Sequence, residues 1–173
     1  MTSSQSPSLL SVKNLRMYYS IKEEYVRAVD DVSFDLNHGE TLGVVGESGC
    51  GKTSIARSII RLLPPNGRIL GGQVIFDGED LLKLSLSKLN EIRWKRISMI
   101  SQSAMNALDP VYKVGDQLTE ALKTHESVSK EEARKRIMDV FELVRISPSR
   151  IDDYPHRFSG GMRQRVVIAL SLI

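Results

Sequence analysis

The first part of the chain is dominated by segments in which apolar and polar residues alternate, as they do in half-buried β-strands. Two such segments are Leu9 to Ser20 and Val26 to Leu36. A third, Gly71 to Leu81, contains an Asp-Gly pair that predicts a tight turn. Thr41 to Gly46 is a short apolar run, which favours a strand buried on both faces. Ile97 to Ser101 is expected to form one more short strand.

The pattern becomes helical elsewhere, where apolar residues recur every three or four positions. The helices predicted ahead of the last one cover Lys52 to Leu63, Ser87 to Arg96, Val114 to Leu122 and Ser129 to Val144. We expect Pro64 and Pro65 to end the first of them. Ser129 and Glu132 have the spacing of a capping box. Ser159 stands where the N-cap of a last, apolar helix belongs.

This order of elements predicts a mixed α/β protein. We expect residues 1–8 to be a disordered lead, residues 9–103 and 158–173 to form an α/β core with an N-terminal antiparallel β subdomain, and residues 104–157 to form a helical subdomain. Hydrophobic residues make up 41% of the chain and charged residues 26%, which is typical of a globular protein.

Composition also narrows the function classes. The net charge of +3 is too small to indicate a nucleic-acid-binding surface. Cys50 is the single cysteine, which rules out an internal disulfide and argues against a Cys-based metal site. The start of the chain lacks the apolar stretch of a secretory signal, and the longest apolar run, Val166 to Ile173, is far shorter than the roughly 20 residues of a membrane span. These features predict a soluble, cytoplasmic chain that reaches a membrane only through a partner.

Gly46 to Thr53 reads GESGCGKT, which matches the phosphate-binding pattern G-x-x-x-x-G-K-[ST] without departures. The glycines let several backbone N–H groups point at one anion, and the following helix adds the positive end of its dipole. Lys52 can reach the β- and γ-phosphates, and the Thr53 hydroxyl can coordinate Mg²⁺. The residues expected to bind ATP in this loop are Gly46, Glu47, Ser48, Gly49, Cys50, Gly51, Lys52, Thr53 and Ser54. A thiol reagent on Cys50 is expected to block binding sterically.

The phosphate loop and the later stretch FSGGM, Phe158 to Met162, together resemble the ATP-binding subunits of ABC transporters, whose signature has the form L-S-G-G-Q. Ser159, Gly160 and Gly161 match that signature, while Phe158 and Met162 depart from its commonest residues. The resemblance implies a P-loop NTPase core of the ABC ATPase type. It also implies a head-to-tail dimer in which Ser159, Gly160, Gly161 and Met162 contact the ATP held by the other subunit.

Further site residues follow from the same resemblance. Gln102 occupies the position of the family's Q-loop glutamine, which implies contacts with Mg²⁺ and with the attacking water. Thr53 and Gln102 are therefore the expected metal ligands. Tyr19 stands where the family places an aromatic side chain that stacks on adenine, and Tyr18 and Tyr25 are open alternatives for that role.

Three longer stretches resemble one branch of the family, the ATPases of dipeptide, oligopeptide and nickel importers: AVDDVSFDL, AMNALDP and YPHRFSGGMRQRV. The branch implies ATP and Mg²⁺ as cofactors, a second identical or different ABC ATPase subunit, and transmembrane permease subunits as partners. It implies neither nucleic-acid binding nor direct membrane insertion. The expected location is peripheral, on the inner face of the cell membrane.

In the family, a strand ending in Asp-Glu and a later histidine follow the signature helix, whereas this sequence stops at Ile173. The resemblance therefore implies that the C-terminal part of the core is missing and that, of the catalytic groups, only Gln102 and Lys52 are present. We expect the 173-residue chain to hydrolyse ATP very poorly. Two alternatives stay open: a non-catalytic nucleotide-binding fragment, and a soluble ABC ATPase of DNA repair or translation. Salt-sensitive binding of DNA or RNA would support the second alternative.

Overall fold

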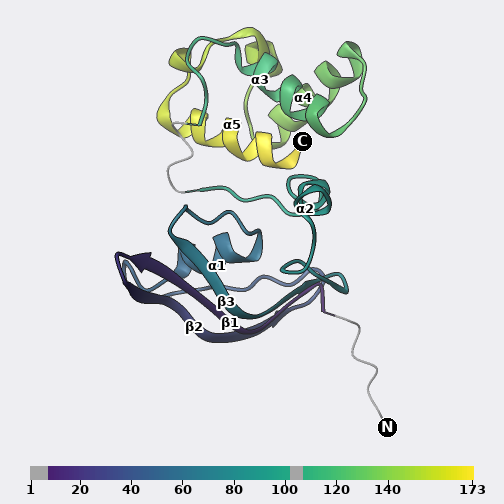
Figure 1. The fold of residues 1–173 in the computed structure, drawn as a ribbon. Coiled ribbons are helices and arrows are strands. Elements are labelled where there is room, and N and C mark those ends of the chain that lie inside the picture. The colour runs from purple at the N-terminus through teal and green to yellow at the C-terminus, as the bar shows by residue number, and fades with distance from the viewer. Residues whose placement is uncertain (1–7, 102–106) are drawn as a thin grey trace. The chain divides into compact units, whose positions relative to one another are not determined.

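The computed structural model describes residues 8–101 and 107–173. The chain divides into two compact units, Met1–Asn90 and Glu91–Ile173. The first consists mainly of an antiparallel sheet with the helix α1 against it, and the second is helical (Figure 1).

The sheet of the first unit has four strands in the order β2-β1-β3-β4. Its strands are β1 (Leu10–Ile21), β2 (Glu24–Leu36), β3 (Gly67–Phe76) and β4 (Glu79–Asp80). All neighbouring pairs are antiparallel, with β1 between β2 and β3. Asp77 and Gly78 connect β3 to β4 with φ angles of 48° and 85°, the left-handed backbone that an Asp-Gly hairpin turn requires. The strands predicted within Leu9 to Ser20, Val26 to Leu36 and Gly71 to Leu81, and this turn, are confirmed.

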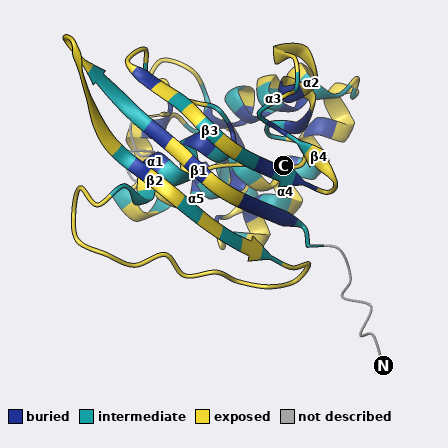
Figure 2. Cartoon of the chain, turned by 60° about the horizontal axis from the view of Figure 1, so that its bottom comes forward, coloured by how far each residue is buried: buried dark blue, intermediate teal, exposed yellow. Residues whose placement is uncertain are grey.

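One face of the sheet forms the core of the first unit. Buried positions alternate with more exposed ones in the middle of β1 and at the end of β3, as the colours of Figure 2 show. The helix α1 (Lys52–Ile59) packs against β1 and β2. The buried apolar side chains of the sheet are Leu10, Val12, Leu15, Met17, Val29, Val74 and Phe76.

Helix α1 ends earlier than the sequence suggests. Arg61 has a φ of 51°, its N–H donates to the carbonyl of Ser58, and the N–H of Leu62 donates to the carbonyl of Arg57. This pair of hydrogen bonds around a left-handed residue is a Schellman motif. The helix is therefore terminated by its own C-cap, Ile60, four residues before Pro64, and the expectation that the prolines end it is wrong.

The predicted strand at Thr41 to Gly46 is also wrong. These residues form no strand, and the Val45 side chain is 91% exposed. A strand buried on both faces needs hydrogen-bonded neighbours and covering layers. No strand in the described part of the chain pairs with this segment, so its apolar residues stay at the surface.

The helical unit is built from α3 (Val114–His125), α4 (Lys130–Leu143) and α5 (Gly160–Leu172), joined by the short 3-10 helices η2 (Pro148–Asp152) and η3 (Pro155–Arg157). The helix α2 (Leu86–Ile92) spans the boundary between the two units in sequence. Residues of α3, α4 and α5 share one core with the connecting segments. Its largest fully buried side chains are Phe141, Leu118, Ile137, Val114 and Val166.

The expected capping residues of this unit are confirmed. The Ser129 hydroxyl accepts a hydrogen bond of 3.1 Å from the Glu132 N–H, and Ser159 accepts one of 3.3 Å from the Met162 N–H. The strand expected at Ile97 to Ser101 is wrong, because Ile97 makes only an isolated bridge with Arg93.

The predicted subdomain boundaries near residues 103 and 157 remain a prediction. Within the described ranges, no helix has both the length and the apolar character that crossing a membrane requires.

Candidate functional site

The phosphate-loop sequence leads directly into α1. Gly51 is the N-cap of this helix and has a φ of 99°. Residues other than glycine rarely adopt this backbone conformation. A Cβ atom at Gly51 would also collide with the backbone carbonyl oxygen of Ala28 in β2. The glycine therefore lets the loop approach the sheet closely, and it fixes where α1 begins.

The ammonium group of Lys52 lies across its own loop. Its Nζ donates hydrogen bonds of 2.7 Å to the backbone carbonyl oxygens of Gly46 and Glu47, and lies 3.5 Å from the sulfur of Cys50. The loop from Gly46 to Cys50 is exposed to solvent. A cation is thus held at the centre of the turn that the sequence predicts to surround a phosphate.

The start of α1 suits an anion. No side chain caps its N-terminus, and its first turn contains no acidic residue. The N–H groups there are accordingly available as donors, and the helix dipole adds partial positive charge. Together with the Lys52 ammonium, these donors fit a polyphosphate.

The chemistry around Thr53 also fits a magnesium ion that is held partly by the nucleotide. Thr53 is exposed on the first turn of α1. In the part of the chain that the structure describes, no three His, Cys, Asp or Glu side chains gather as a metal site would need. Mg²⁺ typically takes few protein ligands and keeps waters and phosphate oxygens in its shell. The other expected ligand, Gln102, lies outside the described residues.

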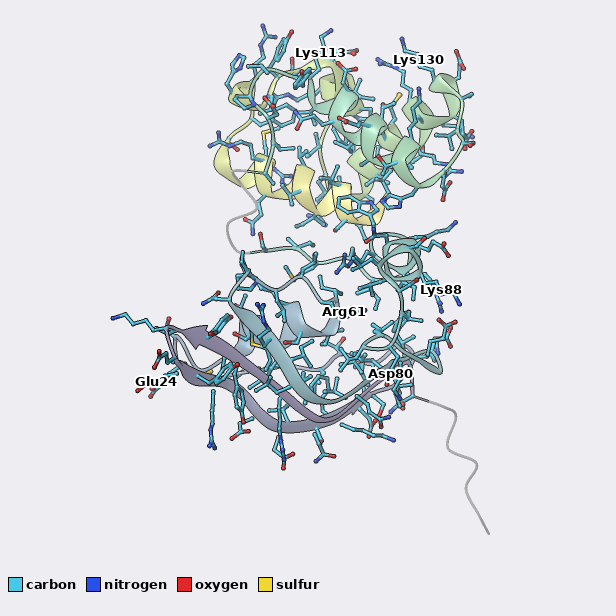
Figure 3. All side chains as sticks on the ribbon, in the orientation of Figure 1. Glu24, Arg61, Asp80, Lys88, Lys113 and Lys130 are labelled. Atoms are coloured by element: carbon cyan, nitrogen blue, oxygen red, sulfur yellow. The ribbon has the colours of Figure 1, made fainter. Side chains whose placement is uncertain are left out.

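Of the three candidate tyrosines, only Tyr19 is linked to the phosphate loop. Its hydroxyl lies 2.9 Å from the hydroxyl of Ser54, the residue after Thr53. The Tyr18 hydroxyl instead donates to Asp30 at 2.6 Å, and this hydrogen bond raises the pKa of Tyr18 and lowers the pKa of Asp30. Tyr25, beside Glu24 at the end of the β1–β2 hairpin, is 56% exposed (Figure 3). That Tyr19 contacts a base stays a prediction.

The signature stretch begins α5 in the helical unit. Ser159 caps the helix, and Gly160 and Gly161 are its first two residues. A Cβ atom at Gly161 would meet no other atom within 4 Å, so packing within the described residues does not demand glycine there. The missing side chain instead leaves the backbone at the helix start open to a close approach from outside the unit.

Arg150 supports this stretch, and the sequence reasoning did not identify it. Its guanidinium group lies 4.5 Å from the centre of the Phe158 ring and donates a hydrogen bond of 3.3 Å to the sulfur of Met162. It also donates to the Asp153 carboxylate at 2.9 Å and to the Arg157 carbonyl at 2.7 Å. The hydrogen bond from Arg150 is the main reason why the pKa of Asp153 is lowered. Phe158 and Met162, the two departures from the common signature, are therefore both contacts of one arginine.

The structure thus brings Tyr19, Lys52 and Ser54 together around the loop of the first unit, and Ser159, Gly160, Gly161 and Met162 at one helix start of the second. Each predicted binding role remains a prediction. No sequence pattern points to Arg150, because it lies in the short 3-10 helix η2, where no periodicity marks a residue.

Comparisons with known proteins agree on one family. A family model described as ABC transporter matches residues 29–173. The dipeptide transport ATP-binding protein DppD of Bacillus subtilis (strain 168) is 48% identical over 168 residues, which cover 95% of this chain and 50% of that protein. The oligopeptide transport ATP-binding protein OppD of Escherichia coli (strain K12) is 46% identical over 171 residues, 98% of this chain and 50% of that protein. The chain therefore spans about half the length of these relatives.

A solved structure shares the fold. The ATP-binding cassette MJ0796, in a dimeric post-hydrolysis state bound to ADP and Pi, superposes with a TM-score of 0.82 at 27% sequence identity. The match covers 94% of this chain and 68% of that one.

Proposed function

The chain belongs to the ABC transporter family, and from that premise we propose that it is part of an ATP-binding subunit that powers the import of peptides. The observation that carries the proposal is the loop from Gly46 to Thr53, with the Lys52 ammonium held over it at the uncapped start of α1. The names of the relatives, which refer to dipeptide and oligopeptide transport, support peptides over nickel as cargo.

In this proposal, the β- and γ-phosphates of ATP replace the carbonyl oxygens of Gly46 and Glu47 as partners of Lys52. The exchange is favourable because a charged acceptor makes a stronger hydrogen bond to an ammonium group than a neutral carbonyl does. The backbone N–H groups at the start of α1 bind the same phosphates. Mg²⁺, held by the Thr53 hydroxyl and by Gln102, would neutralise phosphate charge during hydrolysis.

The signature would act on the ATP of a second subunit. A head-to-tail dimer brings the start of α5 to the nucleotide held by its partner, where Ser159, Gly160, Gly161 and Met162 contact the γ-phosphate. The open approach at Gly161 supports this, and the MJ0796 cassette was solved as a dimer with ADP and Pi. The ATP-binding subunit would lie on the inner face of the cell membrane, where transmembrane permease subunits would complete the importer.

ATP binding by the 173-residue chain tests the proposal. We expect Lys52→Ala to weaken ATP binding at least about tenfold, since a charged hydrogen-bond donor to the phosphates is lost. Lys88→Ala removes one exposed ammonium group from α2 and serves as the control (Figure 3). Equal ATP affinity of the wild type and Lys52→Ala would contradict the proposal. Titration of a fluorescent ATP analogue or calorimetry gives the dissociation constants.

A further inference from the structure

We infer that Ser54 is a positioning residue, which holds the Tyr19 ring in place for the nucleotide base through the hydrogen bond between the two hydroxyl groups. The inference rests on the proposed ATP-binding function. It assigns to Ser54 an action through Tyr19, in place of the direct phosphate contact that its neighbourhood to Thr53 suggests.

The backbone of Tyr19 is already fixed. In β1 it lies opposite Val26 of β2 and opposite Gly67 of β3. The next residue is held as well, because the Ser20 N–H donates a hydrogen bond of 2.8 Å to the Asn66 carbonyl. What remains free is the rotation of the side chain about its two torsions. The residue across β3 is a glycine, which places no side chain against the ring on that side.

The hydrogen bond to Ser54 removes this remaining freedom. The two hydroxyl oxygens lie 2.9 Å apart, a normal distance for this kind of bond. A tyrosine held at its backbone and at the far end of its ring can present only one orientation of the ring faces. The residues are 35 positions apart in sequence, so the bond ties strand β1 directly to the first turn of α1.

Ser54 is a rigid anchor for this purpose. Only 7% of its surface is exposed, and its carbonyl accepts a hydrogen bond of 2.7 Å from the hydroxyl of Ser58, which is fully buried. Thr53, its neighbour in sequence, is by contrast exposed. Within the first turn of α1, therefore, Thr53 faces solvent and any ligand there, while the Ser54 hydroxyl is engaged with the aromatic ring.

A ligand with a base and a ligand without one distinguish the two possible roles of Ser54, which are positioning of Tyr19 and direct contact with phosphate. ATP carries the base, whereas inorganic tripolyphosphate offers only the phosphate chain. We expect Ser54→Ala and Tyr19→Phe each to weaken ATP binding by the 173-residue chain about three- to tenfold, the range of one lost hydrogen bond, with a smaller effect on tripolyphosphate. The double variant should be no weaker than either single one, since both remove the same bond. Ser54→Thr keeps a hydroxyl and should retain most of the ATP affinity.

Tyr18→Phe is the matched control. It removes the hydroxyl of the tyrosine next to Tyr19, which is hydrogen-bonded to Asp30 and not to Ser54. It should leave the ratio of the affinities for ATP and tripolyphosphate unchanged. Circular dichroism melts establish that each variant is folded. Additive losses in the double variant, or equal losses for ATP and tripolyphosphate, would overturn the inference alone. Failure of the wild-type chain to bind either ligand in a Lys52-dependent way would overturn the proposed function and this inference with it.

Discussion

Helices α1 and α5 both begin beside glycines of a recognisable motif, and they satisfy their first N–H groups in different ways. Gly51 starts α1 without any side-chain cap, whereas the Ser159 hydroxyl caps α5 by accepting from the Met162 N–H. Because a hydroxyl can accept one hydrogen bond while donating its proton elsewhere, Ser159 can remain a cap and still donate to a phosphate. The start of α1 therefore leaves its donors open to an anion, whereas the start of α5 is complete as part of the fold and available for a further contact.

Among substitutions at the two helix starts, we expect the largest effect from a change at Gly51. Gly51→Ala should lower the free energy of unfolding by about 2–4 kcal/mol and weaken ATP binding, because a left-handed backbone and a collision with the Ala28 carbonyl both oppose a Cβ there. Chemical denaturation and ATP titration measure the two effects. Gly39→Ala, at a left-handed turn with no atom within 4 Å, is the control for backbone strain alone. A Gly51 variant as stable as the wild type would refute the close approach.

The cap of α5 should give a smaller effect. Ser159→Ala removes the hydrogen bond to the Met162 N–H and should cost about 1 kcal/mol of stability. Ser159→Asp restores an oxygen acceptor at the N-cap and should recover most of that loss. Urea unfolding of the three proteins provides the comparison. If Ser159→Ala and Ser159→Asp were equally destabilised, the serine would not act as a cap.

The contribution of the Arg150–Asp153 interaction to the stability of the fold should depend on pH. The hydrogen bond from Arg150 lowers the pKa of Asp153 in the folded protein, so the unfolded chain binds a proton at a higher pH than the folded one. This contribution to stability is present above the unfolded pKa of about 3.9 and is lost as pH falls through the lower folded pKa. Unfolding midpoints measured between about pH 2 and 6 should therefore fall less steeply for Asp153→Asn than for the wild type. Parallel curves for the two proteins would speak against the interaction.

Gly161 should show the smallest effect on stability. Gly161→Ala adds a Cβ that meets no atom within 4 Å, at a helical position where alanine is favoured over glycine. We expect stability to stay the same or rise by up to about 1 kcal/mol, in a thermal melt compared directly with Gly51→Ala. A clear loss of stability would mean that the glycine serves the fold of the unit, and the comparison between the two helix starts would lose its contrast.

Local patterns predicted most of the fold. The alternation in Leu9 to Ser20 and Val26 to Leu36 and the Asp-Gly turn identified the hairpins, and hydroxyl residues before helical periods identified the caps at Ser129 and Ser159. Each of these signals depends on neighbours within a few residues. The fold class and the family assignment are likewise supported by the comparisons.

Apart from the early end of α1, the features that were missed depend on partners outside their own segment. Thr41 to Gly46 has the composition of a buried strand, but a strand forms only where others pair with it, and the described chain offers none. The bond between Tyr19 and Ser54 joins residues far apart in sequence, and the sequence alone left Tyr18 and Tyr25 as open alternatives to Tyr19. Arg150 contacts both ends of the signature stretch from an irregular segment, where no periodicity points to it.

The hydrogen bonds that hold Lys52 to its own loop have a consequence for the affinity of the site. A lysine side chain in solution samples many rotamers, and ordering it on binding costs about 0.5–1.5 kcal/mol. In this protein the carbonyl oxygens of Gly46 and Glu47 have already confined the ammonium group. Most of that entropy is therefore lost during folding, so the proposed exchange of these carbonyl partners for phosphate oxygens would lose little more of it.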